Sequence, residues 1–142
     1  MSQKLVARLL QEFGEDVREI PNARGDETVV VGRDKLTAVL THLRDAEGCE
    51  QLSDVVGVDY PERDERFEVN YLLRSWRNDH RVIVKVDVAE DDPVPTATGI
   101  YRSADWHERE VFDLFGIPFD GHPDLRRILC HHEFEGHPLR KD

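Results

Sequence analysis

FEVNYLLRSWRNDHRVIVKVDV, residues 67–88, carries the clearest structural pattern in this chain of 142 residues. Apolar and polar residues alternate over 67–73 and again over 82–88, which is the pattern of strands with one buried face. The tripeptide Asn78-Asp79-His80 lies between the two runs and favours a turn. The segment therefore predicts a β-hairpin that packs one face against a core.

Weaker patterns on both sides of the hairpin predict further elements. Runs of β-branched residues predict strands over 28–31 and 52–60. Apolar residues at helical spacing predict helices over 2–13, from Asp34 to about Gly48, and over 103–115. The prolines of residues 91–96 predict a plain connecting segment there, because proline lacks a backbone donor and restricts its neighbour.

The third predicted helix, over 103–115, has the clearest ends. Ser103 or Asp105 could cap its start, and Gly116 is a typical C-terminal stop. Its inward stripe is expected to consist of Ala104, His107 or Glu108, Val111, Leu114 and Phe115.

The order of these elements predicts an α+β fold, in which helices cover one face of a small, mostly antiparallel sheet and an extended C-terminal tail follows. We expect one domain overall. Residues 1–102 would form its α+β body, and residues 103–142 would form the helix and a docking segment.

Composition excludes several classes of function. The chain has 19 Lys and Arg against 30 Asp and Glu, for a formal net charge of −11. This charge argues against nucleic acid or anionic lipid as the main partner, because binding phosphates needs a basic face. No apolar run approaches the ~20 residues that cross a bilayer, and the N-terminus lacks the pattern of a secretory signal. Two cysteines, Cys49 and Cys130, predict no disulfide framework and a reducing compartment.

Carboxylates and arginines cluster around the third predicted helix. Trp106, Glu110 and Asp113 would share one helical face, and Arg126-Arg127 follows shortly after. Glu110 and Asp113 could act as an acid–base pair in a cleft, but the sequence shows no cleft. We favour a docking surface, because guanidinium groups bind carboxylates in a bidentate and orienting way.

The sequence gives only weak support to metal, nucleotide or iron–sulfur sites. The histidine-rich segment from Cys130 to His137 invites a zinc site, but its spacing is unsuited to two ligands on one helical turn. The sequence has no glycine-rich phosphate loop, and two cysteines cannot hold an iron–sulfur cluster. A small metal-dependent hydrolase stays an alternative, with the candidate residues His122, His131, His132, Glu133 and His137.

Two segments resemble a known family. EREVFDLFGIPFDGHPDLRRIL at 108–129 and EGHPLRKD at 135–142 are similar to the two signatures of the C subunit of proton-translocating NADH:quinone oxidoreductase, respiratory complex I. The corresponding subunit of membrane-bound hydrogenases is similar in this module and is the alternative within this class. Cys130-His131-His132 departs from the family pattern, in which acidic residues usually precede an aromatic.

The resemblance implies a subunit of the peripheral arm that docks on the neighbouring D subunit and supports the quinone-reducing module, on the cytoplasmic face of the inner membrane. It implies no catalytic residue, cofactor or metal in this chain, since flavin, iron–sulfur clusters and quinone belong to partner subunits of the enzyme. We expect the partner interface to comprise Glu108, Arg109, Glu110, Asp113, His122, Asp124, Arg126, Arg127, His137 and Arg140.

Overall fold

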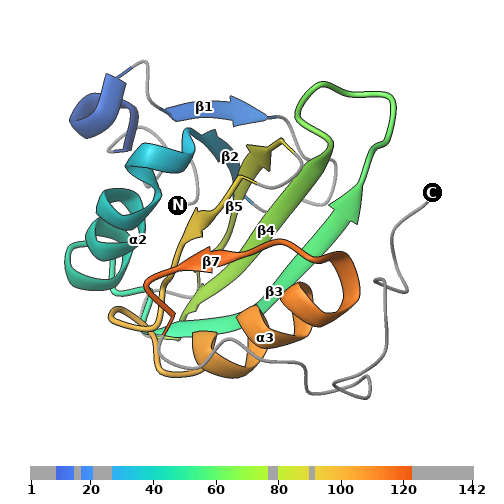
Figure 1. The fold of residues 1–142 in the computed structure, drawn as a ribbon. Coiled ribbons are helices and arrows are strands. Elements are labelled where there is room, and N and C mark those ends of the chain that lie inside the picture. Colours follow the sequence, from blue (N-terminus) through green and yellow to red (C-terminus); the bar gives the residue numbers. More distant parts are fainter. Residues whose placement is uncertain (1–8, 15–16, 21–26, 77–79, 90–91, 123–142) are drawn as a thin grey trace.

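Figure 1 shows a computed structural model of the chain, which describes residues 9–14, 17–20, 27–76, 80–89 and 92–122. Residues 9–13 are helical, and Gly14 follows them with a positive φ of 60°, as the predicted helix stop requires. The remaining elements in chain order are β1 (Val17–Ile20), β2 (Glu27–Val31), the 3-10 turn η2 (Arg33–Lys35), α2 (Leu36–Asp45), β3 (Gln51–Asp59), β4 (Phe67–Ser75), β5 (His80–Val88), β6 (Val94–Pro95), α3 (Ala104–Phe115) and β7 (Phe119–Asp120).

Five strands form one mixed sheet in the order β1-β2-β5-β4-β3. The β1–β2, β5–β4 and β4–β3 pairs are antiparallel, whereas β2 and β5 are parallel. The predicted hairpin is confirmed, and in its observed register Tyr71 lies opposite Val84 and Leu73 lies opposite Val82. The sheet is therefore mostly antiparallel and the fold is α+β, as the sequence predicts.

One face of this sheet carries the core. Alternate residues of β4 and β5, from Phe67 to Leu73 and from Val82 to Val88, are almost fully buried. These side chains form a single cluster with the buried residues of α2 and α3. The core cluster therefore contains residues from both sides of position 103, where the sequence predicts the boundary between the α+β body and the third helix. Among the residues that the structure describes, no helix is long and apolar enough to cross a membrane.

The prediction of a plain connecting segment over residues 91–96 is wrong at residues 94–95. The proline-containing connection includes a two-residue strand, β6, that pairs in parallel with β7. The backbone N–H groups of Val94 and Thr96 donate to the carbonyls of Pro118 and Asp120, each at 2.9 Å. Pro95 lies between these two donors, so its missing N–H leaves no ladder position empty.

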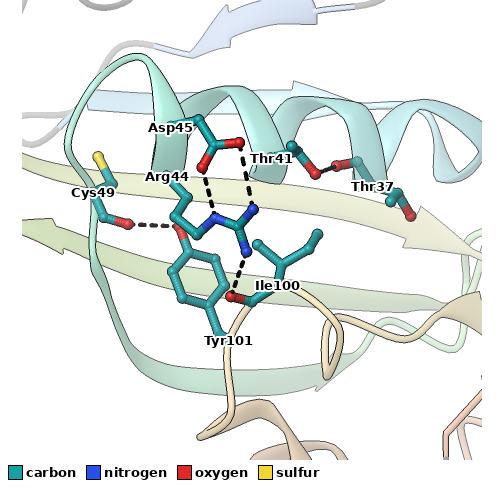
Figure 2. Close-up of polar contacts among 7 residues, drawn as sticks. All are labelled: Thr37, Thr41, Arg44, Asp45, Cys49, Ile100 and Tyr101. Atoms are coloured by element: carbon teal, nitrogen blue, oxygen red, sulfur yellow. Dashed lines mark hydrogen bonds and ion pairs between the residues drawn. The ribbon is translucent and has the colours of Figure 1, made fainter.

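The end of α2 is tied to the segment before α3 (Figure 2). Arg44 binds both carboxylate oxygens of Asp45, and its Nη1 donates to the carbonyl of Ile100 at 3.0 Å. The hydroxyl of Tyr101 donates to the carbonyl of Cys49 at 2.6 Å, and the whole Tyr101 side chain is buried. These contacts fix the point from which α3 starts.

Candidate functional site

Helix α3, whose residues 108–115 begin the first of the two family signatures, packs along β3 (Figure 1). Gly57 on β3 permits this approach, since a Cβ at that position would lie 2.7 Å from a ring carbon of Phe115. The Phe115 ring also meets the Phe67 ring edge to face, with centroids 6.3 Å apart. Gly116 ends the helix in the left-handed conformation, at φ 77°, as predicted.

The start of α3 differs from the prediction. Ser103 occupies the N-cap position, but its hydroxyl donates to the carbonyl of Leu52 on β3 at 3.0 Å and makes no capping bond. The serine therefore fastens the helix to the sheet rather than satisfying the helix's own N–H groups.

Glu108 is fully buried and holds the segment between β6 and α3. Its carboxylate accepts hydrogen bonds from the Thr96 hydroxyl at 2.5 Å and from the Ala97 N–H at 2.7 Å. Burial raises the pKa of Glu108 to about 7, against the lowering effect of these two bonds and of His122. Glu108, the first glutamate of the signature, thus holds the backbone at Thr96 and Ala97 against α3.

The raised pKa predicts a pH-dependent stability. A folded Glu108 keeps its proton up to about pH 7, whereas an unfolded one loses it near the ordinary glutamate pKa. The folded state binds more protons in this window, so stability falls as pH rises, by on the order of 3 kcal/mol across it. Glu108→Gln is neutral throughout, and its amide can accept from the Ala97 N–H through Oε1 and donate to the Thr96 hydroxyl oxygen through Nε2.

Urea unfolding of wild type and Glu108→Gln between about pH 5 and about pH 8 measures the difference. We expect the wild type to lose stability relative to the variant as pH rises. Parallel pH profiles would show that Glu108 is ionised throughout.

Two histidines lie within 4 Å of aspartate carboxylates near α3. His107 Nδ1 lies 3.2 Å from Asp54 Oδ1, which links the helix to β3. His122 Nε2 lies 3.2 Å from Asp105 Oδ1 and 3.1 Å from the Asp105 carbonyl oxygen. The His122 side chain is fully buried, so these contacts fasten the chain after β7 to the first turn of α3.

The structure separates the candidate interface residues into groups. Glu108, Asp113 and His122 have buried side chains, because they face the body of the chain and not its surface. These three residues are therefore not part of the interface proposed below. Arg109 and Glu110 are partly exposed. The remaining candidates, Asp124, Arg126, Arg127, His137 and Arg140, lie outside the described residues.

Trp106 is the exposed aromatic of α3, with 52% of its surface accessible. The Arg109 guanidinium lies 5.8 Å from the centre of its ring. Glu110 and Asp113, the alternative acid–base pair, are not together at the surface, because only Glu110 is accessible. The outer face of α3 therefore presents an aromatic and mixed charges.

The other chemical candidates gain no support from the described residues. No group of three possible metal ligands occurs among them, and His131, His132, Glu133 and His137 of the zinc hypothesis lie outside them. Cys49 is buried, and burial together with Glu47 and Glu50 raises the pKa of its thiol to about 12. A protonated thiol is a poor nucleophile.

Comparison with known proteins gives one consistent result. The family model for the 30 kDa subunit of respiratory-chain NADH dehydrogenase matches residues 29–142, which include both signatures. The NADH-quinone oxidoreductase C subunit of Erythrobacter litoralis is 51% identical over 134 residues, covering 94% of this chain and 54% of the relative. The C subunit of Phenylobacterium zucineum is 49% identical over 142 residues, covering 100% and 66%. The chain thus spans between about half and two thirds of these relatives' length.

Two solved structures share the fold. A trypsin-resistant fragment of Nqo5 has a TM-score of 0.77 and 39% sequence identity, covering 88% of this chain and 100% of the fragment. A chain of an archaeal membrane-bound sulfane sulfur reductase has a TM-score of 0.83 at 24% identity, covering 98% and 83%, and shows the fold alone. Given the family match over most of its length and these relatives, the chain belongs to the family of the 30 kDa subunit of respiratory-chain NADH dehydrogenase.

Proposed function

We propose that this chain is the C subunit of a proton-translocating NADH:quinone oxidoreductase. The observation that carries the proposal is the identity of about half, along nearly the whole chain, to relatives that are named as the C subunit of NADH-quinone oxidoreductase. The chain would lie in the peripheral arm, on the cytoplasmic face of the inner membrane. It would dock on the neighbouring D subunit and support the quinone-reducing module.

In this proposal the chain contributes binding surface and no catalytic side chain, cofactor or metal. Flavin, iron–sulfur clusters and quinone would be held by partner subunits. The outer face of α3 supports a docking role, since Trp106 is exposed beside the partly exposed Arg109 and Glu110. Aromatic and arginine side chains are enriched where protein surfaces bind tightly.

Separation of mildly solubilised membranes on a native gel, with mass spectrometry of the band that contains this chain, tests the assembly. We expect co-migration with flavin and iron–sulfur subunits and with membrane subunits. Co-migration with hydrogenase subunits would assign the chain to the related complex. Recovery of this chain alone, in the soluble fraction, would contradict the proposal.

Charge reversal at Arg126 and Arg127 tests the docking residues that the sequence predicts. Arg126→Glu with Arg127→Glu is expected to lower recovery of the chain in the complex by about tenfold or more, because like charges at an interface repel. Lys35→Glu with Arg102→Glu makes the same charge change at two exposed positions and serves as the control. Circular dichroism of the purified chains verifies folding. Equal recovery of both variants would remove these arginines from the interface.

A further inference from the structure

Two threonine hydroxyls lead outward from the buried carboxyl of Glu108. The hydroxyl of Thr96 lies 2.5 Å from Glu108 Oε1, and the hydroxyl of Thr98 lies 3.0 Å from that of Thr96. Glu108 is fully buried, whereas Thr96 and Thr98 are partly exposed. These oxygens therefore form one hydrogen-bonded chain that runs from the core toward the surface, and both threonines belong to the segment between β6 and α3.

Two backbone N–H groups restrict how this chain can be bonded. The Ala97 N–H donates to Glu108 Oε2 at 2.7 Å, so Oε1 is the oxygen that faces the threonines. The Thr98 N–H donates to Thr96 Oγ1 at 3.2 Å. A threonine hydroxyl has one donor and two acceptor places, so this bond leaves Thr96 Oγ1 with one donor and one acceptor place. Thr96 can then accept from the Glu108 carboxyl or from the Thr98 hydroxyl, but not from both.

We propose that Glu108, Thr96 and Thr98 form a proton-binding site, in which proton uptake by Glu108 reverses the hydrogen bond between the two threonine hydroxyls. In the ionised state Thr98 donates to Thr96, and Thr96 donates to Glu108 Oε1. In the protonated state the new O–H of Glu108 donates to Thr96, and Thr96 donates to Thr98. The net change is one proton taken from water, and each threonine oxygen carries one hydrogen in both states.

The reversal changes what Thr98 presents at the surface. While Glu108 is ionised, the Thr98 hydrogen points to Thr96, and only acceptor places face outward. Once Glu108 is protonated, that hydrogen is free to donate to water or to a protein that binds there. A proton bound in the core thereby turns a surface acceptor into a surface donor. The site needs no partner subunit, so it goes beyond the proposed membership of an oxidoreductase complex and is independent of it.

The surroundings of Glu108 bring its titration near neutral pH. Burial raises the pKa of Glu108 to about 7, against the lowering effect of its two hydrogen bonds and of His122, whereas Asp105 of α3 raises it. From the sheet, Tyr71 of β4 interacts with Glu108: burial first, and then the charge of Glu108, raise the pKa of the Tyr71 hydroxyl. Both protonation states of Glu108 are therefore populated near pH 7.

Shifts of opposite sign in the pKa of Glu108 test the reversal. Thr96→Val removes the donor to the ionised carboxylate, so the pKa of Glu108 is expected to rise by about one pH unit. Thr98→Val leaves the Thr96 hydroxyl without an acceptor in the protonated state alone, so the pKa is expected to fall by about half a pH unit. Thr41→Val removes a hydroxyl that binds the Thr37 carbonyl on α2, and it is expected to leave the pKa of Glu108 unchanged.

NMR titration of the isotope-labelled Glu108 carboxyl in the full chain measures each pKa, with the signal assigned by its absence from Glu108→Gln. The ring signals of His122 in the same titration separate its ionisation from that of Glu108. Circular dichroism verifies folding, and Thr96→Ser, which keeps the hydroxyl, is expected to titrate like wild type. Should Thr96→Val fail to fold, the sign of the Thr98→Val shift decides alone. Shifts of the same sign in both valine variants, or an unchanged pKa in folded Thr98→Val, would overturn the inference, as would ionisation of Glu108 at the ordinary glutamate pKa.

Discussion

Asp59→Ala is expected to lower the free energy of unfolding by about 3–5 kcal/mol, because it leaves the buried charge of Arg66 without the carboxylate that binds it. Arg66 Nε and Nη2 donate to the two carboxylate oxygens of Asp59 at 2.7 and 2.8 Å. Asp59 is 1% exposed and Arg66 is 8% exposed. The pair closes the connection between β3 and β4, so its loss loosens the edge of the sheet on which α3 rests.

Two controls separate burial from charge in this experiment. Asp45→Ala removes an exposed partner of Arg44 with similar geometry and is expected to lower the stability far less than Asp59→Ala, because water screens an exposed ion pair. Asp59→Leu combined with Arg66→Met removes both buried charges and is expected to regain most of the lost stability. Denaturant unfolding measures all three variants. Equal costs for Asp59→Ala and Asp45→Ala would show that the buried pair is well solvated.

The hairpin of β4 and β5 was predictable because one face of the sheet is buried and the other is open. This asymmetry produces the alternation that residues 67–73 and 82–88 display. Strand β1 was missed, since Val17-Arg18-Glu19-Ile20 is short and half charged. The parallel pairing of β2 with β5 was missed as well. Pairing between strands distant in the chain depends on the crossover that joins them, and no local pattern encodes it.

Glu108 shows where a signal was present in the sequence but was interpreted differently. It occupies an inward position of the α3 stripe with Ala104, Val111 and Phe115, a place that the helical spacing allows for either Glu108 or His107. A carboxylate on an apolar stripe indicates a buried group with a specific partner, here Thr96 and Ala97. Asp113 carries no such signal, and its burial became visible only in the folded chain. Neither carboxylate is therefore available on the exposed face of α3.

Phe115→Ala is expected to cost about 3–5 kcal/mol, because the ring fills the space between α3 and the sheet. Phe115 is 6% exposed and contacts Phe67 and the backbone at Gly57. Trp106→Ala, on the exposed face of the same helix, is the matched control and is expected to cost under about 1 kcal/mol. Thermal or urea unfolding of the purified chains provides the comparison.

Gly57→Ala tests the same contact from the strand. Its added Cβ would meet the Phe115 ring at 2.7 and 2.8 Å, so the ring or the helix must move, at an expected cost of about 1–3 kcal/mol. Phe115→Leu added to Gly57→Ala removes the clashing ring atoms and is expected to cost less than the sum of the two single changes. Strict additivity would show that α3 does not pack on β3 through this contact. The close approach at Gly57 would then not be what positions α3 on the sheet.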